Sequence, residues 1–153
     1  MIQRKQTIYL LLSALILASI FLHTFDFAQI STDGAESLSN TQYLQDKVLD
    51  VYDHILFMIL TGLISGLSLL AIFLYKNRNL QLSVSKTNIV LCIILMVDIA
   101  YCLIQDINKI DGIYSIVPYF GLWAILLAIV AILLAIRGIN HDNKLVKSMD
   151  RLR

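Results

Sequence analysis

The residue with the clearest chemical potential is a carboxylate in the middle of an apolar segment. Asp98 lies within residues 88–105, which read NIVLCIILMVDIAYCLIQ. A helix needs about 20 apolar residues to cross a bilayer core ~30 Å thick, and a carboxylate at that depth costs at least ~2.5 kcal/mol. Asp98 must therefore face other helices or water. Tyr101 follows it at helical spacing on the same face, and Ser65 offers a hydroxyl from another apolar segment at similar depth.

Two roles fit this polar group of Asp98, Tyr101 and Ser65. Intramembrane carboxylates often mark proton or ion paths, which indicates a relay. A hydrogen-bonded, protonated packing residue is the other role, because burial disfavours the charged form. No Lys, Arg or His lies at that depth within the apolar segments to pair with Asp98. The sequence therefore favours the structural role, with Asp98 protonated at neutral pH.

Four further polar residues lie at the outer ends of the first two apolar segments, namely His23, Asp26, Asp53 and His54. Imidazoles and carboxylates are metal ligands by type. No close ligand motif such as H-x-x-x-H contains them, however, so ordinary interfacial polar residues are the favoured interpretation. We predict no metal site here.

Two cysteines, Cys92 and Cys102, lie in the same apolar segment. Ten helical residues separate them by ~15 Å, whereas a disulfide needs Cα atoms within ~7 Å, so both are expected to pack as small apolar residues. The chain contains no Gly-rich phosphate loop and no G-x-S-x-G, H-E-x-x-H or C-x-x-C motif. We therefore predict no catalytic residue, no cofactor and no enzymatic activity.

The elements that carry these residues are four apolar blocks. Of the 153 residues, 58% are hydrophobic and 15% are charged, against about 25% charged in an average soluble domain. We predict one membrane domain over 1–153, an all-α, up-down-up-down four-helix bundle. Cleavage of the first block as a signal peptide stays an alternative. The spans are expected at about 7–27, 53–75, 87–106 and 115–137, with an outer loop and helix over 28–52 and a cytosolic tail over 138–153.

The outer part of the chain is predicted to extend the second helix. A capping box begins at Ser39, and apolar residues keep helical spacing from Tyr43 onward. One helix, or two nearly continuous helices, from about 40 to 75 would be ~54 Å long, so its first third would stand outside the membrane. Phe25 and Phe27 alternate with polar or small neighbours, which is a weak strand signal.

The second span contains a GxxxG pair, Gly62 and Gly66. Such small residues let membrane helices approach closely. Packing inside the chain's own bundle is the favoured explanation, and a homo-oligomer that uses the same face stays an alternative.

Basic residues are distributed unevenly. The N-terminus, the loop between the second and third spans and the tail hold ten Lys and Arg residues, whereas the two other loops hold two. Basic loops stay inside, so both termini are predicted to be cytosolic in a bacterial inner membrane. The lipid bilayer is the expected environment. A net charge of only +1 gives no indication of nucleic-acid binding.

The tail over 143–153 reads NKLVKSMDRLR, the pattern of a short basic amphipathic helix. We hypothesise that it folds back toward the N-terminus and brings Asp150 near Arg4 or Lys5. The basic ends would then form a surface for a cytosolic protein partner or anionic lipid, and a frayed tail is the alternative. The candidate surface residues are Arg4, Lys5, Lys147, Asp150 and Arg151.

The two ends also carry a family resemblance. Residues 1–11, MIQRKQTIYLL, and residues 145–153, LVKSMDRLR, flank the apolar blocks, and YFGLW at 119–123 adds to them. With this layout the chain resembles an uncharacterised family of small integral membrane proteins from Bacteroidetes-type bacteria, domain of unknown function 4293. The resemblance implies an inner-membrane location and four helices. It carries over no activity, substrate or catalytic residue.

Together these patterns predict a small non-enzymatic inner-membrane protein with a structural or partner-binding role, which engages a membrane or cytosolic protein. The alternative is a small transporter or an ion- or proton-coupled membrane protein that uses Asp98. A metal- or quinone-handling membrane enzyme is a third, less favoured class.

Overall fold

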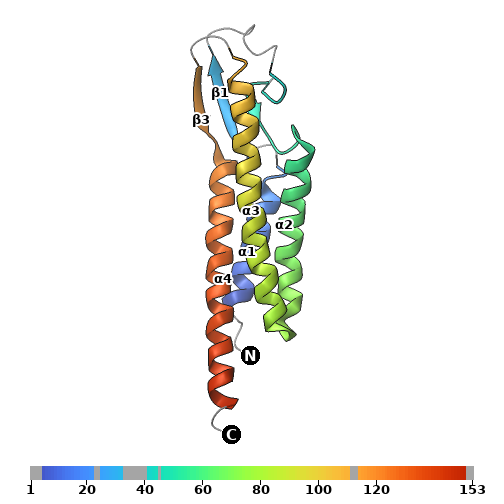
Figure 1. The fold of residues 1–153 in the computed structure, drawn as a ribbon, viewed down its shortest axis with the longest axis vertical. Coiled ribbons are helices and arrows are strands. Elements are labelled where there is room, and N and C mark those ends of the chain that lie inside the picture. The colour runs from blue at the N-terminus through green and yellow to red at the C-terminus, as the bar shows by residue number, and fades with distance from the viewer. Residues whose placement is uncertain (1–4, 23–24, 33–40, 45, 111–113, 151–153) are drawn as a thin grey trace.

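The computed structural model describes residues 5–22, 25–32, 41–44, 46–110 and 114–150, with the backbone alone at 5, 32, 114 and 144–150. This part of the chain is mostly helical, with four helices and a small sheet (Figure 1). In chain order the elements are α1 (Lys5–Ser19), β1 (Ala28–Thr32), β2 (Val48–Leu49), α2 (Ile55–Phe73), the 3-10 turn η2 (Leu74–Lys76), α3 (Arg78–Ile107), β3 (Tyr114–Pro118) and α4 (Phe120–Asp150).

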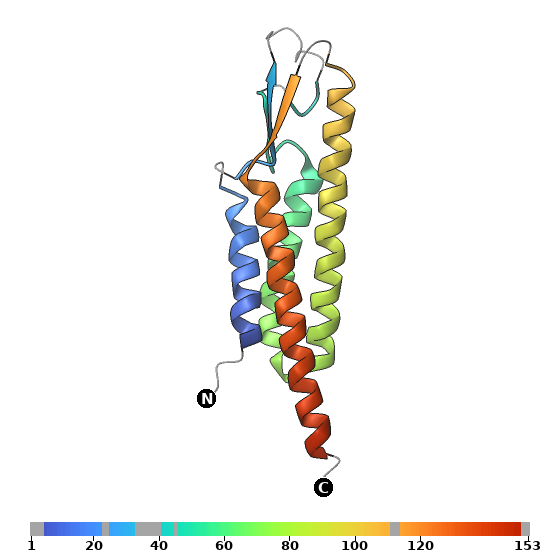
Figure 2. The ribbon, with the colours of Figure 1, turned by 90° about the vertical axis from the view of Figure 1, so that its left-hand side faces the viewer.

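The helices lie side by side along one axis, and the strands gather at one end of them (Figures 1 and 2). α1 packs against α2 and α4, and α3 packs against the same two helices. The start of α1 and the end of α4 lie toward the end opposite the sheet. Each helix contributes fully buried apolar side chains to the core between them, for example Leu17, Phe57, Leu95 and Ile125.

Three of the described helical segments are long and apolar enough to cross a membrane: Ile55–Lys76, Arg78–Ile107 and Phe120–Asn143. They also expose large apolar side chains, for example Val97. Apolar surface of this extent is typical of a protein that faces lipid. The apolar helix Gln6–Ser19 is shorter, so the fourth span stays a prediction.

The prediction of an all-α fold is wrong at the end where the sheet lies. β1 is the central strand of a three-stranded antiparallel sheet in the order β2-β1-β3. Ala28 lies opposite both Leu49 of β2 and Pro118 of β3. The segment after α1 is thereby tied to the residues before α2 and to the residues before α4. The weak strand signal at Phe25 and Phe27 lies directly before this strand.

The predicted outer extension of the second helix is also wrong. Residues 41–44 and 46–54 contain β2 and irregular backbone, and α2 begins at Ile55. Lys47 has a left-handed backbone conformation (φ 69°), which interrupts a right-handed helix. The predicted capping residue Ser39 lies outside the described residues. Burial near the sheet overrides the helical pattern, because two side chains of that stripe, Leu44 and Val51, are buried in the core there together with Leu49.

The C-terminal tail does not form a separate helix. α4 continues without interruption to Asp150 and projects past the other helices (Figure 2). The predicted fold-back of the tail is therefore wrong for the backbone up to this residue. The remaining parts of the candidate surface lie outside the described part of the chain, namely Arg4, Arg151 and the side chains of Lys5, Lys147 and Asp150.

The start of α4 is held tightly against the segment that follows α1. The backbone N–H of Gly121 donates to the carbonyl of Asp26 (2.8 Å). A Cβ at Gly121 would lie 2.5 Å from the carbonyl oxygen of Phe25 and 2.6 Å from that of Asp26, so a larger residue would force the backbone apart. Gly66 on α2 is the opposite case, because among the described residues no atom beyond its own helix backbone and chain neighbours lies within 4 Å of its Cβ position.

We predict that Gly121→Ala lowers the free energy of unfolding by about 1–3 kcal/mol, the usual cost of extra atoms in a packed region. Gly66→Ala, the matched control, should be neutral or stabilising by up to ~1 kcal/mol, because alanine favours the helix. Thermal unfolding of both variants in the same detergent measures the difference. An unchanged unfolding temperature for Gly121→Ala would contradict the close approach.

Candidate functional site

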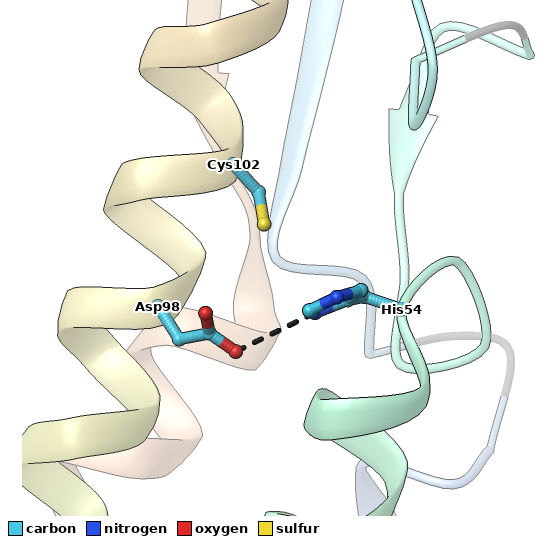
Figure 3. Close-up of side chains that lie close together, drawn as sticks. All are labelled: His54, Asp98 and Cys102. Carbon is cyan, nitrogen blue, oxygen red and sulfur yellow. Dashed lines mark ion pairs between the residues drawn. The ribbon is translucent and has the colours of Figure 1, made fainter.

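Three chemistry-bearing side chains converge where the helices meet the sheet (Figure 3). His54 occupies the N-cap of α2 with an extended backbone (φ −131°, ψ 125°), and Asp98 and Cys102 lie one turn apart on α3. One ligand atom from each residue lies within 4.8 Å of the other two. In the part of the chain that the structure describes, no other three His, Cys, Asp or Glu side chains meet in this way. We call these three residues the cluster.

The cluster is largely shielded from solvent. The side chains of His54 and Asp98 are 23% and 19% exposed, and Cys102 is 3% exposed. His54 Nδ1 lies 3.5 Å from Asp98 Oδ2, yet neither buried atom has a hydrogen-bond partner among the described residues. A buried polar atom without a partner costs ~1–3 kcal/mol. Two such atoms face each other beside a thiol, so these three side chains could together hold a ligand.

This arrangement corrects the expectation that Asp98 lacks a basic neighbour at its depth. The spacing of the apolar blocks put His54 at an outer helix end and Asp98 in mid-span. α3 has 30 residues and is therefore about 45 Å long, so it continues well past the level at which α2 begins. An imidazole therefore lies beside the carboxyl of Asp98.

Aromatic rings hold the imidazole of His54 in place. Its ring makes edge-to-face contacts with Tyr43 (centroids 5.4 Å apart) and Phe57 (5.1 Å). Phe57 contacts Phe27 in the same way (5.6 Å). Such contacts contribute ~0.5–1.5 kcal/mol each. Phe27 precedes β1, so the sheet end, α2 and the segment that carries Tyr43 together fix the orientation of the ring.

A buried carboxylate holds the segment that carries Tyr43. Asp106 is fully buried. It accepts hydrogen bonds from the backbone N–H groups of Gln42 (3.1 Å to each oxygen) and Tyr43 (2.6 Å), and from Lys109 Nζ (3.1 Å). Burial raises the pKa of the Tyr43 phenol, and the charges of Cys102 and Asp106 add to the rise. Asp106 was missed as a functional residue, because in the sequence it only opens a polar loop.

The other two residues predicted to join Asp98 lie elsewhere. Tyr101 is 60% exposed, and its hydroxyl accepts a hydrogen bond from Gln105 Nε2 (3.1 Å). Ser65 donates to the carbonyl of Ala14 on α1 (3.2 Å). The polar neighbours of Asp98 are instead His54 and Cys102. The apolar pattern had placed His54 further out, at a helix end.

The GxxxG pair makes no close helix contact within the described chain. A Cβ at Gly62 would meet Phe21 Cζ at 3.8 Å, and one at Gly66 would meet nothing within 4 Å. The favoured explanation, tight packing inside the bundle, is therefore not supported. The homo-oligomer stays a prediction.

A second polar group lies nearer the opposite end of the bundle and is bonded internally. Asn88 Nδ2 donates to Ser68 Oγ (2.7 Å). Ser68 Oγ lies 3.2 Å from Ser13 Oγ, which donates to the carbonyl of Leu10 (2.8 Å). These contacts join α1, α2 and α3, as interhelical hydrogen bonds do in membrane proteins. We assign this group a structural role.

A carboxyl beside the cluster has a raised pKa. Asp53 Oδ2 accepts a hydrogen bond from the N–H of Asp50 (2.6 Å). Burial raises the pKa of Asp53 from 3.8 to about 6, and the charges of Asp50, Asp46 and Asp26 add to the rise, while the hydrogen bond opposes it. Neither Asp53 nor Asp26 belongs to the cluster, and His23 lies outside the described residues.

We predict that the wild type loses stability relative to Asp53→Asn as the pH rises from about 4 to about 6. The pKa in the folded state, about 6, exceeds the ordinary value of 3.8. The folded state therefore keeps a proton that the unfolded state releases, and this stabilisation is complete below the lower value and lost above the higher one. Asparagine keeps an acceptor for Asp50 and cannot ionise.

Thermal unfolding of the wild type, Asp53→Asn and the control Asp142→Asn on α4 across this pH range measures the effect. A difference between wild type and Asp53→Asn that stays constant with pH would contradict the burial of this carboxyl.

Comparison with known proteins gives one match. Residues 2–152 match the family model described as a domain of unknown function, DUF4293. No curated protein and no solved structure matches the chain. Because the family model spans nearly the whole sequence, the chain belongs to the DUF4293 family.

Proposed function

We propose that this protein is a small, non-enzymatic integral membrane protein that binds a transition-metal ion of the Zn²⁺ class at His54, Asp98 and Cys102. One observation carries the proposal: three ligand atoms of different residues lie within 4.8 Å of one another. Two of these residues contribute buried atoms that have no hydrogen-bond partner among the described residues.

The separation between His54 and Asp98 fits a shared ion better than a hydrogen bond. Zn²⁺ binds nitrogen and oxygen at about 2.0–2.2 Å and sulfur at about 2.3 Å, so two tetrahedral ligands lie about 3.3–3.8 Å apart. The 3.5 Å between His54 Nδ1 and Asp98 Oδ2 falls in this range, whereas a good N–H···O hydrogen bond is about 2.9–3.0 Å long.

The ligand types restrict the metal. A thiolate together with an imidazole suits Zn²⁺ and other borderline or soft ions, whereas Mg²⁺ and Ca²⁺ prefer oxygen ligands. Three protein ligands leave a fourth tetrahedral position for water or an exogenous ligand. Binding requires a neutral imidazole and a thiolate, so it releases protons and weakens in acid.

A second candidate function uses the same carboxyl without a metal. The pair of His54 and Asp98 beside apolar helices also supports an ion- or proton-coupled membrane protein, because such intramembrane pairs form proton relays. The expectation of a partner-binding protein relied on an outer helix and a folded-back tail. Neither element is present in the described chain, so we do not favour that role.

We further propose a bacterial inner-membrane location, with an up-down-up-down bundle in which α1 is the fourth span and both termini are cytosolic. The start of α1 and the end of α4 lie toward the same end of the helices (Figure 1), which agrees with the ten Lys and Arg residues assigned to that side. The cluster would then lie at the outer side of the membrane.

We predict that the purified, metal-free protein binds one Co²⁺ or Zn²⁺ ion per chain. Co²⁺ should produce a thiolate-to-metal absorption band, because Cys102 becomes a ligand. Cys102→Ser should abolish the band, and His54→Ala or Asp98→Asn should weaken binding at least about tenfold, as the loss of a ligand does. An excess of Mg²⁺ or Ca²⁺ should not displace the ion.

Cys92→Ser is the matched control, since it removes the other buried cysteine of α3 and leaves the cluster intact. It should bind Co²⁺ as the wild type does. Absence of the thiolate band in the wild type, or its loss in Cys92→Ser but not in Cys102→Ser, would refute the metal site. Proton uptake into proteoliposomes that requires Asp98 would then support the second candidate.

The topology predicts opposite results for two reporter fusions. A fusion at Arg153 should report the cytosol, and a fusion near Gly34 should report the outer side, because basic residues favour the cytosolic side. A cytosolic signal from both positions would contradict the four-span arrangement.

A further inference from the structure

We infer that Asp106 is a positioning residue for the cluster: it holds the segment 41–44 so that Tyr43 covers His54 and limits access from water to the cluster. The inference rests on the proposed function for the identity of the ion that enters. Access to Cys102 is measured without a metal, so the positioning role of Asp106 and the proposed metal binding can fail separately.

The spacing along α3 places Asp98 and Cys102 of the cluster on the same helix face as Asp106, the residue that holds segment 41–44. Asp98, Cys102 and Asp106 follow one another at intervals of four residues, which is about 6 Å of rise per step. The side chains of Cys102 and Asp106 are both buried, which agrees with this placement. A segment fixed to Asp106 therefore lies next to the cluster, on the side toward the end of α3.

The attachment is strong for such a short segment. The Asp106 carboxylate accepts from two consecutive backbone N–H groups, those of Gln42 and Tyr43, at 2.6–3.1 Å. Hydrogen bonds to an ionised acceptor are roughly twice as strong as neutral ones. Lys109 adds an ion pair to the buried carboxylate from a side chain that is 39% exposed, so solvent weakens this contact. The backbone contacts therefore carry most of the attachment.

Tyr43 connects this attachment to the cluster. Its ring makes an edge-to-face contact with the His54 ring, at 5.4 Å between centroids and an interplanar angle of 70°. A ring nitrogen of His54 in turn lies within 4.8 Å of the Cys102 sulfur. Cys102 itself is almost fully buried. A solute that approaches from the sheet side must displace Tyr43 or its segment to reach the sulfur.

The reactivity of the two native cysteines tests this cover. The full-length protein in nanodiscs is treated with a charged, membrane-impermeant thiol reagent, and mass spectrometry measures the labelling rate at Cys102 and Cys92. Asp106→Ala and Tyr43→Ala should each speed labelling of Cys102 at least about tenfold, because local opening becomes easier. Labelling of Cys92 should stay unchanged, since that residue is buried in the bundle interior.

Two conservative variants separate the cover from other effects. Lys109→Gln keeps both backbone contacts of Asp106, and Tyr43→Phe keeps the ring over His54. Both should label Cys102 within about twofold of the wild-type rate. Equal Cys102 rates in the wild type, Asp106→Ala and Tyr43→Ala would overturn the inference. A parallel rise at Cys92 would also overturn it, because the bundle as a whole would then have loosened.

Measuring Co²⁺ binding beside Cys102 labelling distinguishes the proposed function from the positioning role of Asp106. If the wild type binds no Co²⁺ but Cys102 is protected as described, the cover stands and the proposed function fails. If Co²⁺ binds through Cys102 but neither alanine variant changes the labelling rate, the proposed function stands and the positioning role of Asp106 fails.

Discussion

An isolated carboxylate among apolar helices is costly, so the elements around Asp98 must supply it with a partner. His54 lies 3.5 Å away, at the point where α2 begins. The extended backbone of this N-cap residue lets the imidazole point toward α3 (Figure 3). The sheet, the aromatic contacts and the attachment of segment 41–44 to Asp106 all lie around this point. The sheet end of the molecule is thus organised around the cluster.

The apolar helices could be predicted from the sequence because length and composition decide them. Three of the four predicted spans correspond to helices that can cross a membrane. The sheet end could not be predicted in the same way. Its strands have two to five residues, too few for a clear alternating pattern, and Ala28 pairs with Pro118 far along the chain. The apolar stripe that begins at Tyr43 suited a helix locally, but two of its side chains, Leu44 and Val51, are buried in the core beside the sheet.

The candidate site was only half visible in the sequence. Asp98 is conspicuous, because it is a charge in an apolar block. Tyr101 and Cys102 follow it on nearly the same helix face, but they lie about 100° apart around the axis. The position of His54 decides that Cys102 belongs to the cluster, whereas Tyr101 faces outward. That position depends on where α2 begins relative to α3. The spacing of four residues between Asp98 and Cys102 was the available signal, and it needed a partner from another segment to be recognised.

X-ray absorption at the zinc edge of the Zn²⁺-loaded, full-length protein tests the central claim most directly. The proposed site predicts one sulfur ligand at about 2.3 Å together with nitrogen and oxygen ligands at about 2.0–2.2 Å, and the loss of the sulfur contribution in Cys102→Ser. A coordination shell of nitrogen and oxygen alone in the wild type would contradict the account, as would a sulfur contribution that survives in Cys102→Ser.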